Sequence, residues 1–357
     1  MTRQDASIPE KWLFLELWGL GDAILMSSAL RAAIDSGKSV TVVTKPATIA
    51  LLSPAFPQVS WIEWTAPWTA FRGKYHLWRW DWKSLLKVIS GLRQQKFECG
   101  FSPRRDPRDH LLLSLAGVRK RYSFRHSWSA AFLNQAIDWS ETPRHRWEDW
   151  NALIEHAGLT SNESQPSLPG DAYCKAIPTQ LAELPRPWIV LHTGAGKPAR
   201  LWPEASWRTV VEALRQNFNF SLIVIPDPIG HGKSLDGIAD AFLDNLSVQA
   251  LAATLAQADA MLGHDSGPAH LAAAVDTPVF AVFGPTEPRW FRPLHPDATI
   301  VHDPQCPFFP CRDYCRFEEP QCMTRLSPDR IRASLVPWLK KNLPDCTITE
   351  RDSSENG

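Results

Sequence analysis

The sequence predicts an α/β protein with two domains, each built on a parallel sheet that carries helices on both faces. Three observations support this fold class. Short apolar runs alternate with helical segments, which is the pattern of parallel strands joined by crossover helices. The alternation occurs twice, on either side of a stretch rich in Pro, Ser and Gly at about residues 161–186. The 357 residues are also long for one hydrophobic core and sufficient for two domains.

The first half opens with an apolar run, a glycine-containing turn and a helix that ends at Gly37. Its strands are expected at 12–18, 39–44, 60–64, 97–102 and 121–124, with a helix at 108–117. The second half repeats the pattern, with strands at 188–194, 220–226, 260–265 and 278–284 and helices at 204–216, 248–258 and 266–275. A last helix at 327–343 is capped by Ser327, with Pro328 in its first turn.

These elements predict two Rossmann-like domains, at residues 1–165 and 186–326, followed by a terminal helix at 327–345. Open parallel sheets of this kind bind their ligands outside the carboxyl ends of the strands. We therefore expect the functional residues in the turns that follow strands.

The composition excludes several classes of protein. The formal net charge is zero, which argues against a generally basic nucleic-acid binder. No run of 18 apolar residues indicates a membrane span, and the first residues lack a secretory pattern. Seven cysteines in a chain of this length do not indicate a disulfide scaffold. The expected location is the cytoplasm.

Positive charge is concentrated in residues 61–130. This window holds 14 lysines and arginines against five acidic residues, an excess of nine, and it also holds seven tryptophans. Tryptophan favours the membrane interface, and Lys and Arg seek phosphate, so this region could meet anionic lipid headgroups. The alternative is a solvated basic face whose tryptophans belong to the core. Both interpretations remain open on the sequence.

Three turns between a strand and a helix carry unusual residues. In LWGLGDAIL, Asp22 either caps a helix or acts as a general base. In HTGAGKPARLW, Thr193 and Gly194 form a small loop suited to phosphate, and Arg200 adds positive charge. In GHDSGPAH, Asp265 and Ser266 are good helix caps, and the same helix start offers free N–H groups to an anion.

Taken together in this order, the motifs resemble glycosyltransferase family 9, the heptosyltransferases of lipopolysaccharide assembly. The resemblance depends on GLGDAILMSSALRAA, on HTGAGKPARLWPEASWRTVV and above all on residues 263–293, GHDSGPAHLAAAVDTPVFAVFGPTEPRWFRP. It implies a GT-B fold, with two Rossmann-like domains facing a cleft and a terminal helix that packs back on the first domain. It also implies an inverting transfer of heptose from ADP-heptose to a lipid-linked glycan at the inner face of the cytoplasmic membrane, without a required metal. The sequence contains no Asp-x-Asp motif.

Residue by residue, the resemblance makes Asp22 the catalytic base. It places Thr193, Gly194 and Arg200 on the phosphate side of the donor, with Arg200 where many members carry Lys. The remaining donor residues it implies are Asp265, Ser266, Gly267 and His270. For the acceptor, the charge pattern suggests that arginines in SPRRDPRDH meet phosphates, namely Arg104, Arg105 and Arg108.

Two departures from the family pattern bear on the donor. His264 stands where members often have Asn or Ser, and the loop PDPIGHGKS at 226–234 replaces a Gly-Glu type loop. Four cysteines in 17 residues could also ligate zinc or a cluster, although their spacing is not that of paired C-x-x-C knuckles; they are Cys306, Cys311, Cys315 and Cys322. The plain alternative for them is a packed loop.

Two other functions remain open on the sequence. One is a nucleotide-sugar 2-epimerase on a similar scaffold, which would need further acid and base residues around the sugar. The other is a binding protein that has lost catalysis, for which Asp22 would be dispensable.

Overall fold

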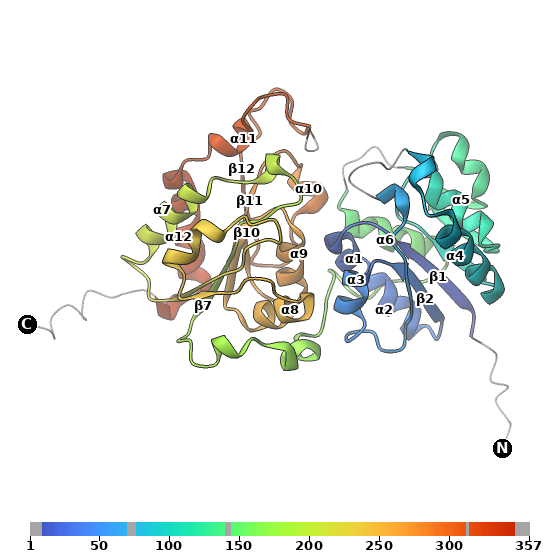
Figure 1. Ribbon diagram of the computed structural model, residues 1–357, viewed down its shortest axis with the longest axis horizontal. Helices are drawn as coiled ribbons and strands as arrows, with labels where there is room; N and C mark the ends of the chain where they lie inside the picture. Colours follow the sequence, from blue (N-terminus) through green and yellow to red (C-terminus); the bar gives the residue numbers. More distant parts are fainter. Residues whose placement is uncertain (1–8, 70–75, 140–143, 312–313, 347–357) are drawn as a thin grey trace, which may run out of the picture. The chain divides into compact units, whose positions relative to one another are not determined.

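The computed structural model describes residues 9–69, 76–139, 144–311 and 314–346 (Figure 1). The chain forms two compact units, Met1–Pro166 and Ser167–Gly357, so the division lies next to the expected boundary at residue 165. Each unit contains one six-stranded sheet with helices, and the predicted α/β class is confirmed. No described helix combines the length and the apolar character needed to cross a membrane.

The first unit has the strand order β3-β2-β1-β4-β5-β6, and every pair is parallel. Its strands are β1 (Lys11–Glu16), β2 (Ser39–Thr44), β3 (Ser60–Glu63), β4 (Cys99–Phe101), β5 (Lys120–Phe124) and β6 (Gln135–Ile137). Its helices are α1 (Leu20–Leu25), α2 (Ser27–Asp35), α3 (Pro46–Leu52), α4 (Trp82–Gln95), α5 (Pro107–Leu115) and α6 (Arg146–His156). The order reverses between β1 and β4, and this reversal is where a ligand is expected in such a sheet.

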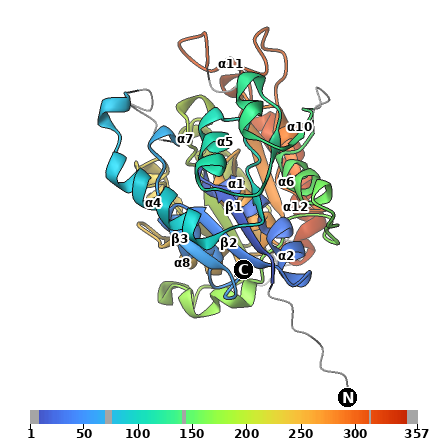
Figure 2. The same ribbon diagram turned by 90° about the vertical axis from the view of Figure 1, so that its right-hand side faces the viewer.

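Helices cover both faces of this sheet. On one face α1 contacts α3 and α6, and α2 also contacts α6; α4 and α5 contact each other on the opposite face (Figures 1 and 2). The covering explains why β1 is a nearly continuous apolar run, since the successive residues Leu13, Phe14 and Leu15 are all buried although neighbouring side chains point to opposite faces. Close packing also requires Gly100 on β4, because a Cβ there would lie 2.8 Å from Val118 Cγ1 and 2.9 Å from Leu113 Cδ2.

The second unit has the order β12-β11-β10-β7-β8-β9, again all parallel. Its strands are β7 (Trp188–His192), β8 (Ser221–Val224), β9 (Ala241–Phe242), β10 (Ala260–His264), β11 (Val279–Phe283) and β12 (Thr299–His302). Its helices are α7 (Glu204–Leu214), α8 (Val248–Gln257), α9 (Gly267–Ala274), α10 (Pro288–Phe291), α11 (Gln321–Thr324) and α12 (Pro328–Asn342). Here the reversal lies between β7 and β10.

Short 3-10 turns join these elements. They are η1 (Pro67–Thr69), η2 (Leu77–Arg79), η3 (Ser127–Phe132), η4 (Gly170–Ala176), η5 (Thr179–Leu181), η6 (Pro198–Arg200), η7 (Lys233–Ile238) and η8 (Pro344–Cys346). The stretch predicted to be a linker is partly packed on the second unit. Tyr173 and Leu181 are buried, η4 contacts α8, and the Leu168 N–H donates to Ala274 O at 2.7 Å.

The terminal helix α12 packs on the second unit, against α7. Its apolar side chains Ile331, Leu335 and Leu339 are buried in the second unit, in the same core as Trp207 of α7. The predicted cap is present, since Ser327 Oγ accepts a hydrogen bond from the Arg330 N–H at 3.2 Å. The helix therefore stabilises the sheet of the unit to which it is joined.

Candidate active site

Asp22 lies in the first turn of α1, just beyond the carboxyl end of β1. Its Oδ2 accepts a hydrogen bond from the Gly19 N–H at 3.3 Å, and its Oδ1 forms an ion pair with Arg104 Nη2. The side chain keeps 21% of its surface exposed. The helix-start contact expected for the carboxylate is present, and the group stays partly open to solvent; its role as a general base stays a prediction.

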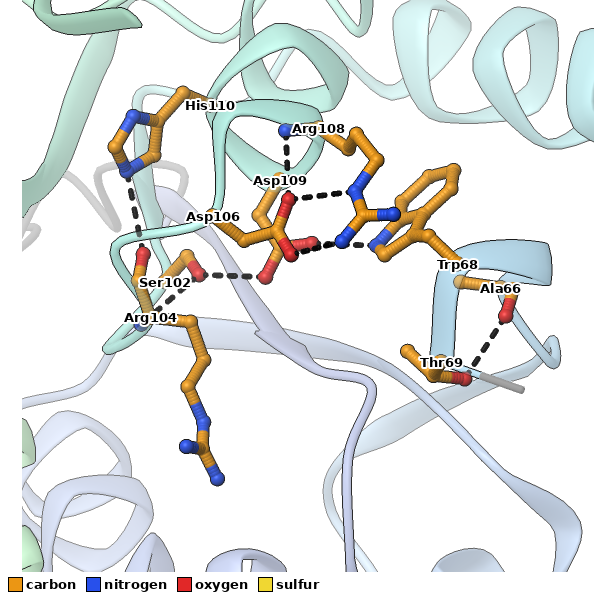
Figure 3. Close-up of polar contacts among 9 residues, drawn as sticks. All are labelled: Ala66, Trp68, Thr69, Ser102, Arg104, Asp106, Arg108, Asp109 and His110. Carbon is orange, nitrogen blue, oxygen red and sulfur yellow. Dashed lines mark hydrogen bonds and ion pairs between the residues drawn. The ribbon is translucent and has the colours of Figure 1, made fainter. Parts of the chain in front are cut away.

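The loop after β4 holds Arg104 in place for this contact (Figure 3). The Arg104 N–H donates to Ser102 Oγ at 3.4 Å, and its carbonyl accepts from Ser123 Oγ at 3.2 Å. Ser102 Oγ in turn donates to Asp109 Oδ2 at 3.1 Å, and Asp109 Oδ1 accepts from Trp68 Nε1 at 2.8 Å. Asp109 is completely buried. A buried hydrogen-bond network thus fixes the backbone that carries the partner of Asp22.

Buried carboxyl groups lie behind this pair. Burial, and then the charge of Asp22, raise the pKa of Glu16 from its ordinary value of 4.5 to about 8. Burial also raises the pKa of Asp109, to about 7. Burial alone would disfavour the charged form of Arg104, but the charges of Asp22, Glu16 and Asp109 outweigh it and raise the pKa of Arg104. The arginine is therefore the fixed positive charge among several acids.

Glu16 also borders a small cavity. Its Oε1 accepts from the Trp18 N–H at 3.2 Å, and its buried Oε2 has no hydrogen-bond partner in the described part of the chain. The cavity has a volume of about 10 Å³ and is lined by Asp22, Arg104 and Arg146 as well as Glu16. This is room for about one water molecule beside the Asp22 carboxylate.

The three arginines expected to bind the acceptor have different surroundings. Arg104 is paired with Asp22, as described. Arg108 is held by Asp106, which accepts from Arg108 Nε at 2.8 Å and from Nη2 at 2.6 Å (Figure 3). Arg105 is exposed, and it forms no ion pair with a carboxylate among the described residues. Of the three, Arg105 is the one whose charge stays available to a ligand.

In the second unit, the structure brings together two of the predicted donor residues from different turns. Arg200 Nη1 lies 3.0 Å from Asp265 Oδ2, and Asp265 is 3% exposed. Ser266 occupies the N-cap position of α9, and Gly267 is the first residue of that helix. The prediction that Ser266 caps through its side chain is wrong, because Ser266 Oγ makes no capping hydrogen bond. His270 lies on the same helix and is buried.

Three hydroxyl groups lie beyond the carboxyl ends of adjacent strands. Thr193 follows β7, Ser266 follows β10 and Thr286 follows β11, and these strands are neighbours in the sheet. All three hydroxyl oxygens are buried and have no hydrogen-bond partner in the described residues. A buried hydroxyl left without a partner costs about 1–3 kcal/mol, so we interpret the row as a site built for a ligand. The sequence analysis missed Thr286, although the stretch FGPTEPRW contains it.

The loop 226–234 borders this row. Asp227 Oδ2 lies 2.7 Å from His231 Nδ1, and a Cβ on Gly194 would lie 2.4 Å from Asp227 Cβ, so only glycine fits there. Beside Thr193 is a pocket of about 380 Å³, lined by Trp202, Glu204 and His231 among others. This volume is in the usual range for small-molecule sites.

His264, the departure from the family pattern, has a structural role. Its Nε2 accepts from the Trp202 N–H at 3.0 Å and from Trp207 Nε1 at 3.2 Å, and the ring is fully buried. Burial lowers the pKa of His264 to about 3, so the ring is neutral at physiological pH. It is a core histidine that fastens the end of β10 to the start of α7.

None of the four cysteines in the loop forms a disulfide within the described residues. The described side chains also contain no group of three or more His, Cys, Asp or Glu arranged to hold a metal ion. Cys322 is buried, and burial together with the neighbouring Cys306, Cys311 and Cys315 raises the pKa of its thiol to about 11. Cys322 is a residue of α11, and its side chain lies in the core of the second unit.

Comparison with known proteins gives the family. The model of glycosyltransferase family 9 (heptosyltransferase) matches residues 85–320. The chain belongs to glycosyltransferase family 9. Lipopolysaccharide heptosyltransferase 1 of Pseudomonas aeruginosa is 30% identical over 176 residues, which cover 43% of this chain. The match spans 48% of that enzyme, so the chain corresponds to about half the length of this family 9 relative.

Solved structures show the same fold over most of this family 9 chain. The Escherichia coli ADP-heptose lipopolysaccharide heptosyltransferase II has a TM-score of 0.71 at 18% identity, covering 93% of this chain and 99% of that chain. The E. coli heptosyltransferase WaaC, solved with ADP-2-deoxy-2-fluoro heptose, has a TM-score of 0.71 at 16% identity, covering 92% and 99%. The GT-B type of fold implied by the resemblance is therefore confirmed.

The raised pKa of Glu16 gives a prediction about stability. Between about pH 4.5 and 8 the folded state holds a proton on Glu16 that the unfolded state releases, so the free energy of unfolding falls as the pH rises through this window. Glu16→Gln removes that loss, because the amide stays neutral. We compare the free energy of unfolding of the variant with that of the wild type at each pH. We expect this difference to be several kcal/mol more in favour of the variant at pH 9 than at pH 5, since each pKa unit is worth about 1.4 kcal/mol.

Thermal unfolding at pH 5, 7 and 9 would measure this difference. Glu63→Gln is the control, because Glu63 is an exposed carboxylate in the same unit. If wild type and Glu16→Gln lose stability in parallel as the pH rises, Glu16 is ionised in the folded protein and the assignment fails.

Proposed function

We propose that this chain is an inverting glycosyltransferase that needs no metal ion and transfers heptose from ADP-heptose to a lipid-linked glycan, such as the lipopolysaccharide core. The observation that carries the proposal is Asp22, a partly exposed carboxylate held by Arg104 at the turn that the family uses for its base. The heptosyltransferase names of the relatives and the ADP-heptose analogue in WaaC support the choice of donor.

In the proposed reaction, Asp22 accepts the proton of an acceptor hydroxyl while its oxygen attacks the anomeric carbon of the sugar. A new C–O bond forms on one side as the bond from that carbon to the diphosphate breaks on the other, which inverts the configuration. The electron pair leaves with ADP. The Arg104 ion pair and the Gly19 N–H orient the carboxylate for this step.

Negative charge grows on the departing diphosphate, and the second unit has groups suited to stabilise it. Arg200 supplies a positive charge, and the start of α9 supplies backbone N–H groups. The hydroxyls of Thr193, Ser266 and Thr286 can donate to phosphate or sugar oxygens, because no described residue occupies them. In the proposed mechanism these protein groups stabilise the charge of the leaving diphosphate, so no metal ion is needed for that role.

For the acceptor side we propose that the protein works at the inner face of the cytoplasmic membrane, bound peripherally through η2 and α4 of the first unit. Leu77, Trp78, Trp82 and Leu86 form an exposed apolar strip, with Trp78 77% and Leu86 63% exposed. Lys83 and Lys87 follow Trp82 and Leu86 in the sequence and are exposed, and α4 contains no acidic residue. Apolar side chains flanked by lysines are suited to a surface of anionic lipid. Figure 2 shows α4 along the outside of the unit.

The role of Asp22 is tested by Asp22→Asn. The amide keeps the shape but cannot accept the proton, so we expect kcat to fall by about 10²- to 10⁴-fold while ADP binding is unchanged. The measurements are ADP release from ADP-heptose with a lipopolysaccharide-core acceptor, and calorimetric binding of ADP. Asp35→Asn, at an exposed carboxylate of the same unit, is the control. Full activity of Asp22→Asn would remove Asp22 as the proposed base, whereas a wild type that binds ADP without transferring sugar would favour a binding protein.

The role of the unpartnered hydroxyls is tested by Thr286→Val. Valine has the same shape without the hydroxyl, so we expect stability without ligand to be unchanged or up to about 1 kcal/mol higher, while the dissociation constant for ADP-heptose rises about 5- to 10-fold. Thr254→Val is the matched control, because the buried Thr254 Oγ1 donates to Ala250 O at 2.9 Å. It should lose about 1 kcal/mol of stability and keep its affinity. The reverse pattern would show that Thr286 is structural.

Membrane binding is tested by liposome flotation with and without anionic lipid. We expect the wild type to float with anionic vesicles and the double variant Trp78→Ser/Trp82→Ser to remain at the bottom, because the variant loses the interfacial indoles. Tyr314→Ser, an exposed aromatic of the second unit, should float like the wild type. Equal flotation of wild type and double variant would show that this strip does not meet the membrane.

A further inference from the structure

Three arginines surround one indole ring at the carboxyl edge of the first sheet. The guanidinium carbons of Arg105, Arg144 and Arg146 lie 5.1, 5.3 and 5.6 Å from the centroid of Trp139. Trp139 follows β6, Arg105 follows β4 and Arg146 is the first residue of α6. Phe124, the last residue of β5, packs edge-on against Trp139 at 5.1 Å between centroids. The ends of three neighbouring strands therefore build this cluster.

Among the residues that the structure describes, the charges of the cluster are not balanced. Asp149 is the carboxylate that contacts it: Arg144 Nε lies 2.8 Å from Oδ1, and Arg146 Nη1 lies 3.0 Å from Oδ2. Both oxygens of this buried group are used by those two arginines, and Arg105 has no carboxylate among the described residues. Among the described residues, three positive charges of the cluster face one negative charge. The indole face attracts cations by about 0.5–2 kcal/mol but does not neutralise them.

The cluster is continuous with the Asp22 site. One cavity is lined by Asp22, Arg104, Arg146 and Asp149. Burial lowers the pKa of Arg146, and the positive charge of Arg104 lowers it further. The positive charges therefore act on one another, although Asp22 pairs with Arg104. Arg105 is exposed and the Arg146 side chain keeps 29% of its surface, so a ligand can reach both. Arg144 Nη2 is buried, which leaves that residue as a support for Asp149 and Trp139.

We propose that Arg105 and Arg146, held on the ring of Trp139, bind an oxyanion of the acceptor sugar, a phosphate or a carboxylate, and thereby bring the acceptor hydroxyl to Asp22. The inference rests on the proposed function, and it revises the acceptor site expected from the sequence. Arg108 is committed to Asp106 and Arg104 to Asp22, whereas Arg146 joins the site from α6. Guanidinium groups suit this ligand because their planar N–H donors match the oxygens of phosphate and carboxylate.

The test is ligand-observed NMR on the full chain with three sugar probes: glucose 6-phosphate, glucuronate and glucose. We expect the probe whose anion matches the acceptor to bind with a millimolar dissociation constant that rises with salt, and glucose to bind much more weakly. The phosphate and carboxylate arms distinguish the two sources of the oxyanion. If both charged probes bind no better than glucose, the subsite does not exist.

Variants locate the binding. Arg105→Gln should weaken the binding of the charged probe at least about 5-fold, since it removes one of two charged donors. Arg119→Gln, an exposed arginine at the opposite edge of the same sheet, should have no effect. Because Arg146→Gln alone would leave Asp149 short of a partner, the variant Arg146→Gln/Asp149→Asn is used, and it should also weaken binding. Unchanged affinity in both site variants would overturn the proposal.

Calorimetry with ADP separates this inference from the proposed function. Arg105→Gln should bind ADP as the wild type does, because the donor residues lie in the second unit. If the wild type binds the anionic probe but not ADP, the proposed donor is wrong and the anion subsite stands. If the wild type binds ADP but not the anionic probe, the anion subsite is wrong and the proposed donor stands.

Discussion

Both sheets of this protein are entirely parallel and carry helices on both faces, and this constraint decides where chemistry can occur. β10 is buried along its length and β1 is buried after Lys11, so their side chains are mostly apolar, and the polar residues Glu16 and His264 stand at the strand ends. The exceptions gather where the strands end. Asp22, Arg104 and Trp139 follow strands of the first sheet, and Thr193, Ser266 and Thr286 follow strands of the second. The positions of the candidate site residues thus follow from one topological rule that applies to both sheets.

Placing charge at such an edge has an energetic cost, because the groups are partly removed from water. The first unit meets this cost with ion pairs and with protonation. Asp22 has Arg104, Asp149 has Arg144 and Arg146, and Glu16 is held neutral at physiological pH by burial. The second unit uses neutral groups more heavily, with hydroxyls and one Arg200–Asp265 pair. This difference agrees with the proposed roles, in which the first unit accepts a proton and the second binds a diphosphate.

The sequence was sufficient for the long strands and for the turns that carry motifs, because continuous apolar runs and glycine turns are local signals. It did not predict β6, β9 or β12, which are short and lie at or near a sheet edge, nor the helices α4 and α6. Asp22, Arg200 and Asp265 were expected from local motifs; the structure shows their ion pairs, and their roles stay predictions. The sequence did not predict the ion-pair partner of each carboxylate. Arg108 pairs with its neighbour Asp106, whereas Arg104 pairs with Asp22, 82 positions earlier in the chain. Thr286 and Glu16 were missed because an unpartnered hydroxyl or a buried acid is a property of packing.

His264 shows how the donor side is held together. Its ring nitrogen accepts from Trp202 and Trp207, which follow Arg200 in the chain, while Asp265 is the next residue after His264 itself. The two members of the Arg200–Asp265 pair are therefore fastened to each other through the core as well as through their own contact. A ligand arriving at this edge finds its cation and its carboxylate already placed, so little conformational entropy is lost there on binding. Under the proposed function, His264 would contribute to donor affinity through this preorganisation.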